Sequence, residues 1–331
     1  MLRRFLWATV AMGALMPLAG HAQIPPLQIT LQAQTTAVNA IAFTPDGDIL
    51  ISGGGHNDGR LRFWRTATGR MLRTIRSQRM GISAIALSPD GEHLASTGED
   101  GEIHFWSLTD GEFKHTLRDH RGNVLDLAIT PDNQVLISAG LDGVKVWDLQ
   151  RYRPLYTLIA FQPITHLALH PDGQTLAGGT PDGDVFLWNL RSGEALANLA
   201  AHEMAITALA FSRDGEILIT GSGDRTLKLW DLGTNRLETT LTGHTGPITA
   251  LALTPDGETL ISGSHDGIRA WDLPSGNLLT HWRGHRDWIT TLAIFPDGRG
   301  IASGDLGGTI KLWQWPPELP PELPGEFDEP T

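Results

Sequence analysis

The chain has 331 residues, of which 40% are hydrophobic, and carries a formal net charge of −12 at pH 7. This charge, with only four lysines and no basic run with interleaved aromatics, argues against nucleic acid or an anionic membrane surface as the main partner. No cysteine is present, which excludes thiol catalysis, cysteine-ligated metal and disulfides, while 38 glycines and 20 prolines suit many short strands joined by turns.

The N-terminal segment has the features of a signal peptide. Two arginines precede an apolar stretch over residues 5–18, which is shorter than the roughly 20 residues that a membrane span needs. The small residues Gly20 and Ala22 then occupy the third and last positions before a cleavage site at Gln23. We therefore predict that residues 1–22 are cleaved near Ala22, not retained as an anchor, and that the mature chain is exported, periplasmic or secreted, without a membrane span.

Tryptophans recur along the remaining chain at an almost fixed interval. The steps between successive members of this series are 41 or 42 residues, and the series comprises Trp64, Trp106, Trp147, Trp188, Trp230, Trp271 and Trp313. A period this regular predicts one supersecondary unit that is repeated seven times.

A second set of residues runs in phase with the tryptophans. These are turn-forming tripeptides, at Pro45-Asp46-Gly47, Pro89-Asp90-Gly91, Pro131-Asp132-Asn133, Pro171-Asp172-Gly173, Arg213-Asp214-Gly215, Pro255-Asp256-Gly257 and Pro296-Asp297-Gly298. Proline suits the second position of a type I turn and glycine the fourth. Because two features share one period, we interpret the chain as a repeat protein with seven units.

The sixth unit illustrates the predicted secondary structure. Apolar runs over residues 237–242, 248–253, 259–262 and 268–271 are each four to six residues long and are separated by glycine, proline or aspartate. Such runs are typical of strands that are covered on both faces. No stretch of the mature chain shows a sustained 3.6-residue apolar period, so we expect essentially no helix there.

Four short strands about every 41 residues, with Gly-His near the start of a unit and Trp-Asp at its end, resemble the WD40 repeat family. The Trp-Asp ending stands at Trp147-Asp148, Trp230-Asp231 and Trp271-Asp272, and is relaxed in the other units. The opening histidine stands at His120, His202, His244 and His285, with Gln34 and Gln78 at the same place in the first two units. The resemblance covers roughly residues 27–315.

This resemblance implies an all-β fold, a seven-bladed β-propeller with four antiparallel strands in each blade, over residues 23–315. It also implies that the sequence repeat is offset from the blade, so that residues 27–33 supply the outer strand of the last blade. We therefore expect an N-terminal strand to close the ring.

The resemblance further places three complete sets of a buried hydrogen-bonding tetrad in the sequence: His120, Ser138, Asp142 and Trp147; His202, Thr220, Asp224 and Trp230; His244, Ser262, Asp266 and Trp271. Serine, histidine and aspartate together also suggest a hydrolase. Their repetition in several units, once with threonine, favours a structural network instead. The other units depart from the pattern: the first two lack the histidine, the fourth lacks it and has Gly178 for the serine, and the seventh has Gly307 for the aspartate.

Three other patterns suggest ligands but favour structural roles. No helix pattern follows Gly53-Gly54-Gly55, so this segment lacks the helix N-terminus of a phosphate loop. The turn aspartates lie about one unit apart, whereas calcium needs six to eight converging oxygens. His166 and His170 are at best a loose metal pair. We predict neither a metal nor a cofactor.

Trp288 stands out among the loop residues. The equivalent positions of the other units hold small or polar residues, among them Ala37, Asn123 and Pro247. An exposed tryptophan beside Arg286 and Asp287 is typical of a binding hot spot, although it could instead cap the closing blade. By contrast, Trp282 replaces a leucine-type strand position and is predicted to be core. The candidate partner-binding residues are Trp288, Arg286, Asp287, Met80, Arg121, Phe161 and Met204.

These patterns predict a non-catalytic scaffold that uses propeller-face loops to bind a protein or peptide partner, and that is monomeric by itself. Two alternatives remain open at this point: a small-ligand or glycan-binding sensor with an aromatic pocket, and an enzyme with a site in the central channel. The enzyme requires titratable groups near the axis, which inner-strand residues such as Ala208 and Ala250 do not supply. The acidic, proline-rich segment 316–331 is predicted to be a poorly ordered tail.

Overall fold

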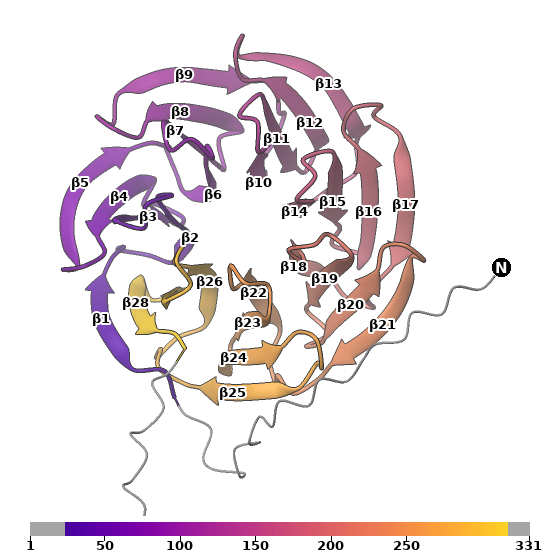
Figure 1. Cartoon of the computed structure of the whole chain (residues 1–331). Helices are drawn as coiled ribbons and strands as arrows, with labels where there is room; N and C mark the ends of the chain where they lie inside the picture. The colour runs from indigo at the N-terminus through magenta and orange to yellow at the C-terminus, as the bar shows by residue number, and fades with distance from the viewer. Residues whose placement is uncertain (1–23, 317–331) are drawn as a thin grey trace, which may run out of the picture.

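Seven four-stranded antiparallel sheets surround a central axis in the computed structural model (Figure 1). The structure describes residues 24–316, so the predicted signal peptide and all but the first residue of the predicted tail lie outside the described residues. Strands are the only regular elements in this range, as expected from the lack of a helical period, and it contains no helix able to cross a membrane. The predicted all-β, seven-bladed propeller is thereby confirmed.

The blades are numbered in chain order, and the strands of each run outward from the axis. Blade 1 comprises β2 (Val38–Phe43), β3 (Ile49–Gly54), β4 (Arg60–Arg65) and β5 (Arg70–Arg76). Blade 2 comprises β6 (Ile82–Leu87), β7 (His93–Gly98), β8 (Glu102–Ser107) and β9 (Phe113–Arg118). Blade 3 comprises β10 (Val124–Ile129), β11 (Val135–Gly140), β12 (Gly143–Asp148) and β13 (Arg153–Ala160). Blade 4 comprises β14 (His166–Leu169), β15 (Thr175–Gly179), β16 (Asp184–Asn189) and β17 (Ala195–Ala200).

The remaining three blades follow the same plan. Blade 5 comprises β18 (Ile206–Phe211), β19 (Ile217–Ser222), β20 (Leu227–Asp231) and β21 (Arg236–Leu241). Blade 6 comprises β22 (Ile248–Leu253), β23 (Thr259–Ser264), β24 (Gly267–Asp272) and β25 (Leu278–Trp282). Blade 7 comprises β26 (Ile289–Ile294), β27 (Gly300–Asp305), β28 (Thr309–Gln314) and, as its outer strand, β1 (Leu27–Gln32).

The N-terminal strand closes the ring. β1 pairs antiparallel with β28, with Leu31 opposite Ile310, and the backbone N–H groups of Ala33 and Gln34 both donate to the carbonyl oxygen of Gly308. Leu31 also packs in a hydrophobic cluster that joins blades 7 and 1 and includes Val38. The prediction that residues near 27–33 complete the last blade is therefore correct.

The Pro-Asp-Gly tripeptides form the turns between the first and second strand of each blade. In blade 1, the N–H of Gly47 donates to the carbonyl oxygen of Thr44, and one oxygen of Asp46 accepts from the Thr44 hydroxyl and the Asp48 N–H. Gly47 has a φ of 74°, and Asn133, its equivalent in blade 3, has a φ of 59°. A left-handed fourth position explains why only glycine or asparagine occurs there.

The hydrophobic core is divided among the seams between neighbouring blades. Between blades 4 and 5, for example, Val185 and Leu199 cluster with Ile206 and Trp230. Each periodic tryptophan lies where the register shifts against the outer strand, as at Phe63/Trp64 in blade 1. A bulge re-aims the side chain locally, so the tryptophan is turned into the seam. Trp282 is buried there too, as predicted, and stacks on Trp315.

Candidate functional site

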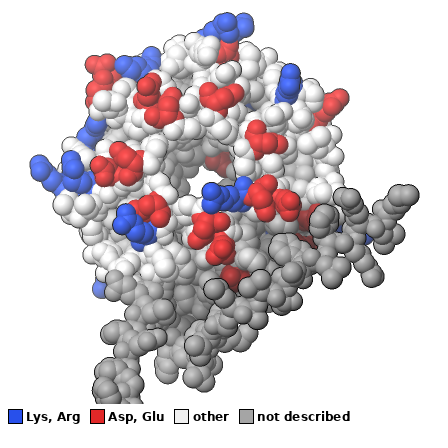
Figure 2. Space-filling view, in the orientation of Figure 1, with Lys and Arg blue, Asp and Glu red and all other residues white. Residues whose placement is uncertain are grey.

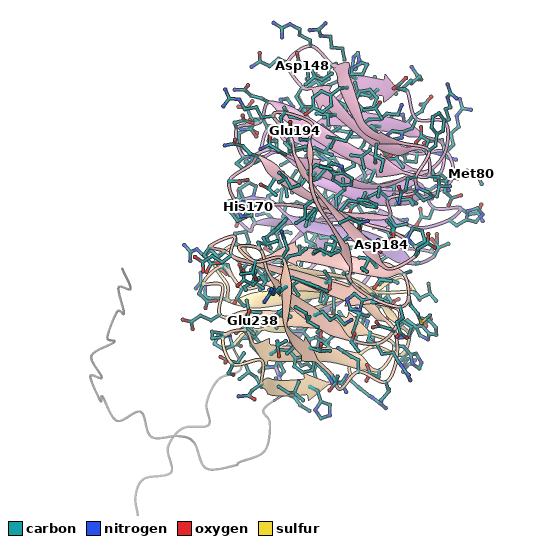
Figure 3. All side chains as sticks on the ribbon, turned by 90° about the vertical axis from the view of Figure 1, so that its right-hand side faces the viewer. Met80, Asp148, His170, Asp184, Glu194 and Glu238 are labelled. Carbon is teal, nitrogen blue, oxygen red and sulfur yellow. The ribbon has the colours of Figure 1, made fainter. Side chains whose placement is uncertain are left out.

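The propeller has two flat faces that differ in their loops. The Gly-His face carries the loops that enter each first strand, such as residues 283–288, and the loops between second and third strands, such as residues 265–266. The Pro-Asp-Gly face carries the Pro-Asp-Gly turns. Figure 3 shows Met80 of the first face and His170 of the second on opposite sides of the molecule. Antiparallel strands alternate in direction, which assigns each loop type to one face.

The four predicted residues of blade 6 form one hydrogen-bonded chain. The indole N–H of Trp271 donates to the hydroxyl of Ser262 at 2.8 Å, and this hydroxyl lies 2.7 Å from Nε2 of His244. Nδ1 of His244 lies 2.6 Å from a carboxylate oxygen of Asp266, whose other oxygen accepts the N–H of Thr245. The chain ties the entering loop to the loop between the second and third strands.

Blades 3 and 5 repeat this arrangement. In blade 3, His120 lies 2.5 Å from Asp142 and 2.6 Å from Ser138, which accepts the indole N–H of Trp147 at 2.8 Å. In blade 5, the corresponding contacts join His202 to Asp224 and Thr220, and Trp230 to Thr220. The structure thus brings together all three predicted sets.

These hydrogen-bonded tetrads are unsuited to nucleophilic catalysis. The Ser262 and Ser138 side chains have no exposed surface, and a nucleophile must reach a substrate. Burial lowers the pKa of His244, against the opposing effect of Asp266, so the imidazole is neutral at pH 7. Burial raises the pKa of Asp142, but hydrogen bonds from His120 and the Arg121 N–H outweigh it and leave that pKa below its usual value. Each group is satisfied within its own blade.

The prediction that blade 7 lacks the aspartate is wrong. His285 lies 2.7 Å from Asp305 and 2.7 Å from Ser303, and the Trp313 indole N–H donates to Ser303 at 2.8 Å. Asp305 lies two residues before Gly307, at the last position of β27. A carboxylate from a different backbone position therefore completes a fourth tetrad. The histidine–aspartate separation found in the other tetrads does not predict it.

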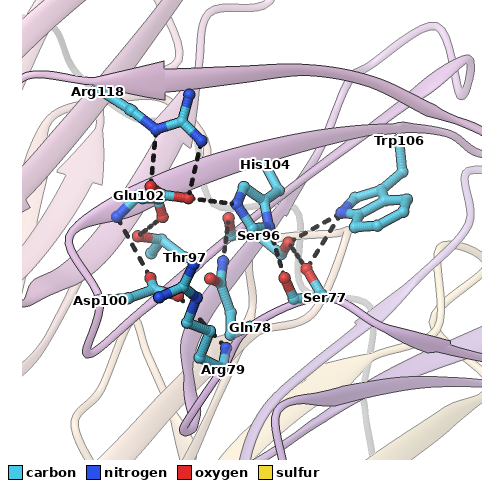
Figure 4. A network of polar contacts seen from close by, with 10 residues as sticks. All are labelled: Ser77, Gln78, Arg79, Ser96, Thr97, Asp100, Glu102, His104, Trp106 and Arg118. Atoms are coloured by element: carbon cyan, nitrogen blue, oxygen red, sulfur yellow. Dashed lines mark hydrogen bonds and ion pairs between the residues drawn. The ribbon is translucent and has the colours of Figure 1, made fainter.

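Blades 1 and 2 replace the histidine with an amide. In blade 1, Nε2 of Gln34 donates to Ser52, which also accepts the indole N–H of Trp64. In blade 2, the Trp106 indole lies within hydrogen-bonding distance of both Ser77 and Ser96, as Figure 4 shows. These blades keep the tryptophan–hydroxyl contact although they lack the histidine, as their sequences predicted.

One further position of the network is not anticipated by the tetrad pattern. The residue two before the periodic tryptophan is basic in six blades: Arg62, His104, Lys145, Lys228, Arg269 and Lys311. Arg269 lies 2.7 Å from Asp266, Arg62 lies 2.9 Å from the buried Asp58, and Nζ of Lys228 donates to the carbonyl oxygen of Ala201. These cations neutralise a carboxylate or hold the entering loop by a hydrogen bond. Their position can be read from the sequence, because it is two residues before each periodic tryptophan.

The central channel contains two titratable groups. Asp126 and His166, on the neighbouring strands β10 and β14, line the same cavity of about 260 Å³. The expectation that inner strands supply no such groups is therefore wrong for blades 3 and 4, where the positions equivalent to Ala208 and Ala250 hold these two residues.

The contacts of this pair indicate a structural role for the carboxylate. One oxygen of Asp126 accepts the N–H of Leu127, and the other accepts the N–H of Leu167 across the seam at 2.8 Å. Burial raises the pKa of Asp126 to about 6 and lowers that of His166 to about 4. Asp126 thus joins blades 3 and 4, as the hydroxyl of Thr249 joins blades 6 and 7 by donating to the carbonyl oxygen of Ile289.

Metal ligands do not converge anywhere in residues 24–316, where no group of three or more histidine, aspartate or glutamate side chains could hold an ion. His170, the loose partner suggested for His166, lies at the Pro-Asp-Gly turn of blade 4. Its ring contacts the carbonyl oxygen of Gly215 and the N–H of Asp172.

The candidate partner-binding residues lie on the Gly-His face, where Arg286, Asp287 and Trp288 share one loop and the other four stand in the entering loops of blades 2 to 5. Their side chains are exposed, from 43% for Met80 to 84% for Phe161, and Trp288 is 46% exposed. Arg121, Met204, Arg286 and Asp287 lie on equivalent loops, and Arg286 and Asp287 line one cavity, whose lining includes none of the other five. Sequence reasoning missed two exposed leucines of the same face, Leu141 and Leu306, because they stand in loops between second and third strands.

Trp288 has a defined place at the seam of blades 6 and 7. Its indole packs edge-on against His265 at 4.8 Å between ring centroids, and its carbonyl oxygen accepts the N–H of Leu306. The backbone of this residue is therefore held by blade 7, while about half of its side chain faces solvent.

The Pro-Asp-Gly face carries a ring of acidic side chains around the mouth of the central channel (Figure 2). Its turn aspartates are fixed by their own turns: hydrogen bonds from Ser88 and the N–H of Glu92 lower the pKa of Asp90, and bonds from Thr254 and the N–H of Glu258 lower that of Asp256. The exposed large apolar side chains of the loops, by contrast, lie on the Gly-His face.

Seven four-stranded blades, each with a tryptophan at the end of its third strand and four with a full tetrad, define a WD40-type β-propeller. A family model described as the first beta-propeller of IFT122 matches residues 37–314, and the chain belongs to this family. The B-type cell cycle switch protein ccs52B of Medicago truncatula is 43% identical over 56 residues, which make up 17% of this chain and 11% of that protein. The chain therefore matches only a small part of this relative's length.

Proposed function

We propose that this protein is an exported, non-catalytic scaffold that binds a protein or peptide partner on its Gly-His face. The observation that carries this proposal is a set of large apolar side chains exposed on the loops of that face: Met80, Leu141, Phe161, Met204, Trp288 and Leu306. Exposed aromatic and methionine side chains are enriched at protein interfaces. None of these six side chains is required by the repeat, because other blades hold small or polar residues at the same places.

Trp288 is the proposed anchor of this surface. The indole is large, and its backbone is fixed by the hydrogen bond from Leu306, so little conformational entropy is lost when a partner covers it. Arg286 and Asp287 beside it supply polar contacts at the rim of the indole. The buried tetrads of blades 6 and 7 hold the loops beside Trp288 in place.

The non-catalytic part of the proposal is supported by the state of the titratable groups. The Ser138 and Ser262 hydroxyls are buried and bonded, and both oxygens of Asp126 accept backbone N–H groups. Catalysis by any of these groups would require breaking contacts that hold blades together.

The test is crosslinking mass spectrometry on tagged protein in extract of the source organism, comparing wild type with Trp288→Ala. Leu279→Ala is the matched control, since Leu279 is 47% exposed but lies on an outer strand. We expect one protein to crosslink through the Gly-His face of wild type and of the control, and to be lost from Trp288→Ala at unchanged melting temperature. If crosslinks are absent or fall only on the rim, the proposal is wrong and a small ligand becomes the hypothesis to test. Recovery of the protein from the cytoplasmic fraction alone, with residues 1–22 intact, would overturn the exported part.

A further inference from the structure

Beside Trp288, the seam between blades 6 and 7 contains a cavity of about 240 Å³ that opens on the Gly-His face. Its charged lining residues are Arg283, Arg286, Asp266 and Asp287, and His265 separates it from the indole. The cavity is large enough to admit a carboxylate-bearing side chain, and the exposed indole lies next to it. The seam therefore combines a polar recess with an apolar platform.

The carboxylates at this recess are already hydrogen-bonded within the chain. Asp266 is already neutralised, because it accepts from His244, the Thr245 N–H and Arg269. Asp287 uses one oxygen to accept the N–H of Trp288. The Asp305 carboxylate, behind His285, is held by His285 and by the Thr309 N–H. None of these three carboxylates forms an ion pair with Arg283 or Arg286.

Neither arginine has a side-chain partner within the described part of the chain. Nε of Arg283 donates to the backbone oxygen of Asp266 at 3.0 Å, which orients the guanidinium and leaves its two terminal nitrogens without a hydrogen bond to residues 24–316. Arg286 makes no ion pair or hydrogen bond in that range and is exposed. A guanidinium fork binds a carboxylate through two parallel hydrogen bonds, which is the strongest polar contact that such a group makes.

We propose that the recess binds an acidic side chain, glutamate or aspartate, of the partner, and that an apolar side chain next to this acid packs on Trp288. This inference rests on the proposed function and names the chemistry of the partner segment. The opposite charge of the two arginines selects the acid, and the exposed indole at the rim selects its apolar neighbour.

The net charge of the whole chain does not oppose this contact. Its acidic ring surrounds the channel mouth on the opposite face (Figure 2), and charges beyond about 8–10 Å are largely screened at physiological salt. Basic segments are expected to bind the acidic Pro-Asp-Gly face instead. The experiment therefore has to distinguish peptides that bind this face from peptides that bind the recess.

The experiment is selection from a library of short random peptides displayed on phage. A double variant, Arg283→Glu/Arg286→Glu, and a triple variant that adds Trp288→Ala both keep the acidic face. The library is first depleted on the triple variant and is then selected on wild type, so that peptides needing either the arginines or Trp288 are retained. We expect the peptides retained by wild type to carry glutamate or aspartate beside leucine, phenylalanine or tryptophan. In solution, these peptides should bind Arg286→Glu about tenfold more weakly or worse, as the loss of a charged hydrogen bond implies.

A charge exchange provides the second measurement. Replacing the acid of a selected peptide by lysine should abolish binding to wild type and restore it to the double variant. Peptides that lack an acid, and that need Trp288 but neither arginine, would overturn this inference and leave the proposed function standing. Recovery of no peptide that depends on Trp288 or on the arginines would contradict both. Equal melting temperatures of wild type and the double variant establish that the fold is intact.

Discussion

At the scale of single residues, the propeller depends on polar groups that have no access to water. Ser262 is the centre of its tetrad because its hydroxyl meets both the Trp271 indole and the His244 ring. If this hydroxyl is removed, water cannot enter the buried site to replace its hydrogen bonds.

Ser262→Ala is expected to lower the free energy of unfolding by about 1–3 kcal/mol, because it leaves two buried polar groups without a partner. Thr109→Ala removes a hydroxyl from an exposed turn and is expected to change the free energy by less than about 0.5 kcal/mol. Chemical denaturation measures both values. Equal effects of the two substitutions would show that the tetrad contributes no stability.

The buried carboxyl of the channel gives a pH prediction. Burial raises the pKa of Asp126 from 3.8 to about 6, so the folded state binds this proton more tightly than the unfolded state does. The contribution of Asp126 to stability is then fully present below pH 3.8 and is lost as the pH rises through about 6. Carboxyl-carbon NMR should show Asp126 titrating near 6, while Asp90 titrates below its usual value. An Asp126 that titrates with the surface carboxylates would disprove its burial.

How well the sequence predicts a buried polar residue differs from one residue to another. The tetrads of blades 3, 5 and 6 are those that the resemblance to the WD40 family implies, and histidine and aspartate stand 22 positions apart in each. Asp305 is not predicted in this way, because its separation from His285 is 20 positions. Only the structure shows that its carboxylate reaches the histidine ring as in the other tetrads. Asp126 and His166 are not predicted either, because neither residue recurs at the equivalent position of the other units.

At the scale of elements, blade 4 shows how a blade can dispense with its tetrad. A β-carbon on Gly178 would lie 2.7 Å from the ring of Trp188. The indole therefore fills the space that a hydroxyl occupies in the other blades. This blade also has the shortest inner strand, β14, with four residues.

Restoring the serine is accordingly expected to harm blade 4. Gly178→Ser should lower the melting temperature by several degrees, because the ring of Trp188 must move and leave the seam underpacked. Gly122→Ser is the matched control, since a β-carbon there meets only Leu141 at 3.8 Å and should have little effect. Calorimetry of both variants provides the measurement. A gain in stability for Gly178→Ser would show that the hydroxyl fits and that the blade lacks only its tetrad.

At the scale of the whole molecule, one short strand connects the two ends of the ring. The number of repeated units follows from the tryptophan period, whereas the order of the strands and the role of β1 follow from the resemblance to the WD40 family, which implies the offset. The residues of the proposed partner-binding surface follow from neither, because the exposed loops do not take part in the period. Leu141 and Leu306 contribute to the same face as Trp288 without any mark in the sequence.

Deletion of residues 24–32 is expected to cost far more than one strand. It removes Leu31 from the cluster that joins blades 7 and 1, and it leaves the edge of β28 unpaired. We expect a large drop in the melting temperature and fast proteolysis in blades 1 and 7. Leu27→Ser, at an exposed position of the same strand, should leave both unchanged. Native-like melting of the deletion variant would show that the ring is stable without closure.

The pairing of β1 with β28 also determines when this molecule can be finished. β1 is synthesised before every other strand of the propeller, and its side chain Gln28 meets Gln314, which is 286 positions later in the chain. Six blades can assemble while synthesis continues, but the first strand must wait unpaired until the last blade has been made. A product that stops before β28 therefore keeps an open edge at each end of its array, and proteases can recognise it. Ring closure therefore distinguishes a complete propeller from one that lacks its last strand.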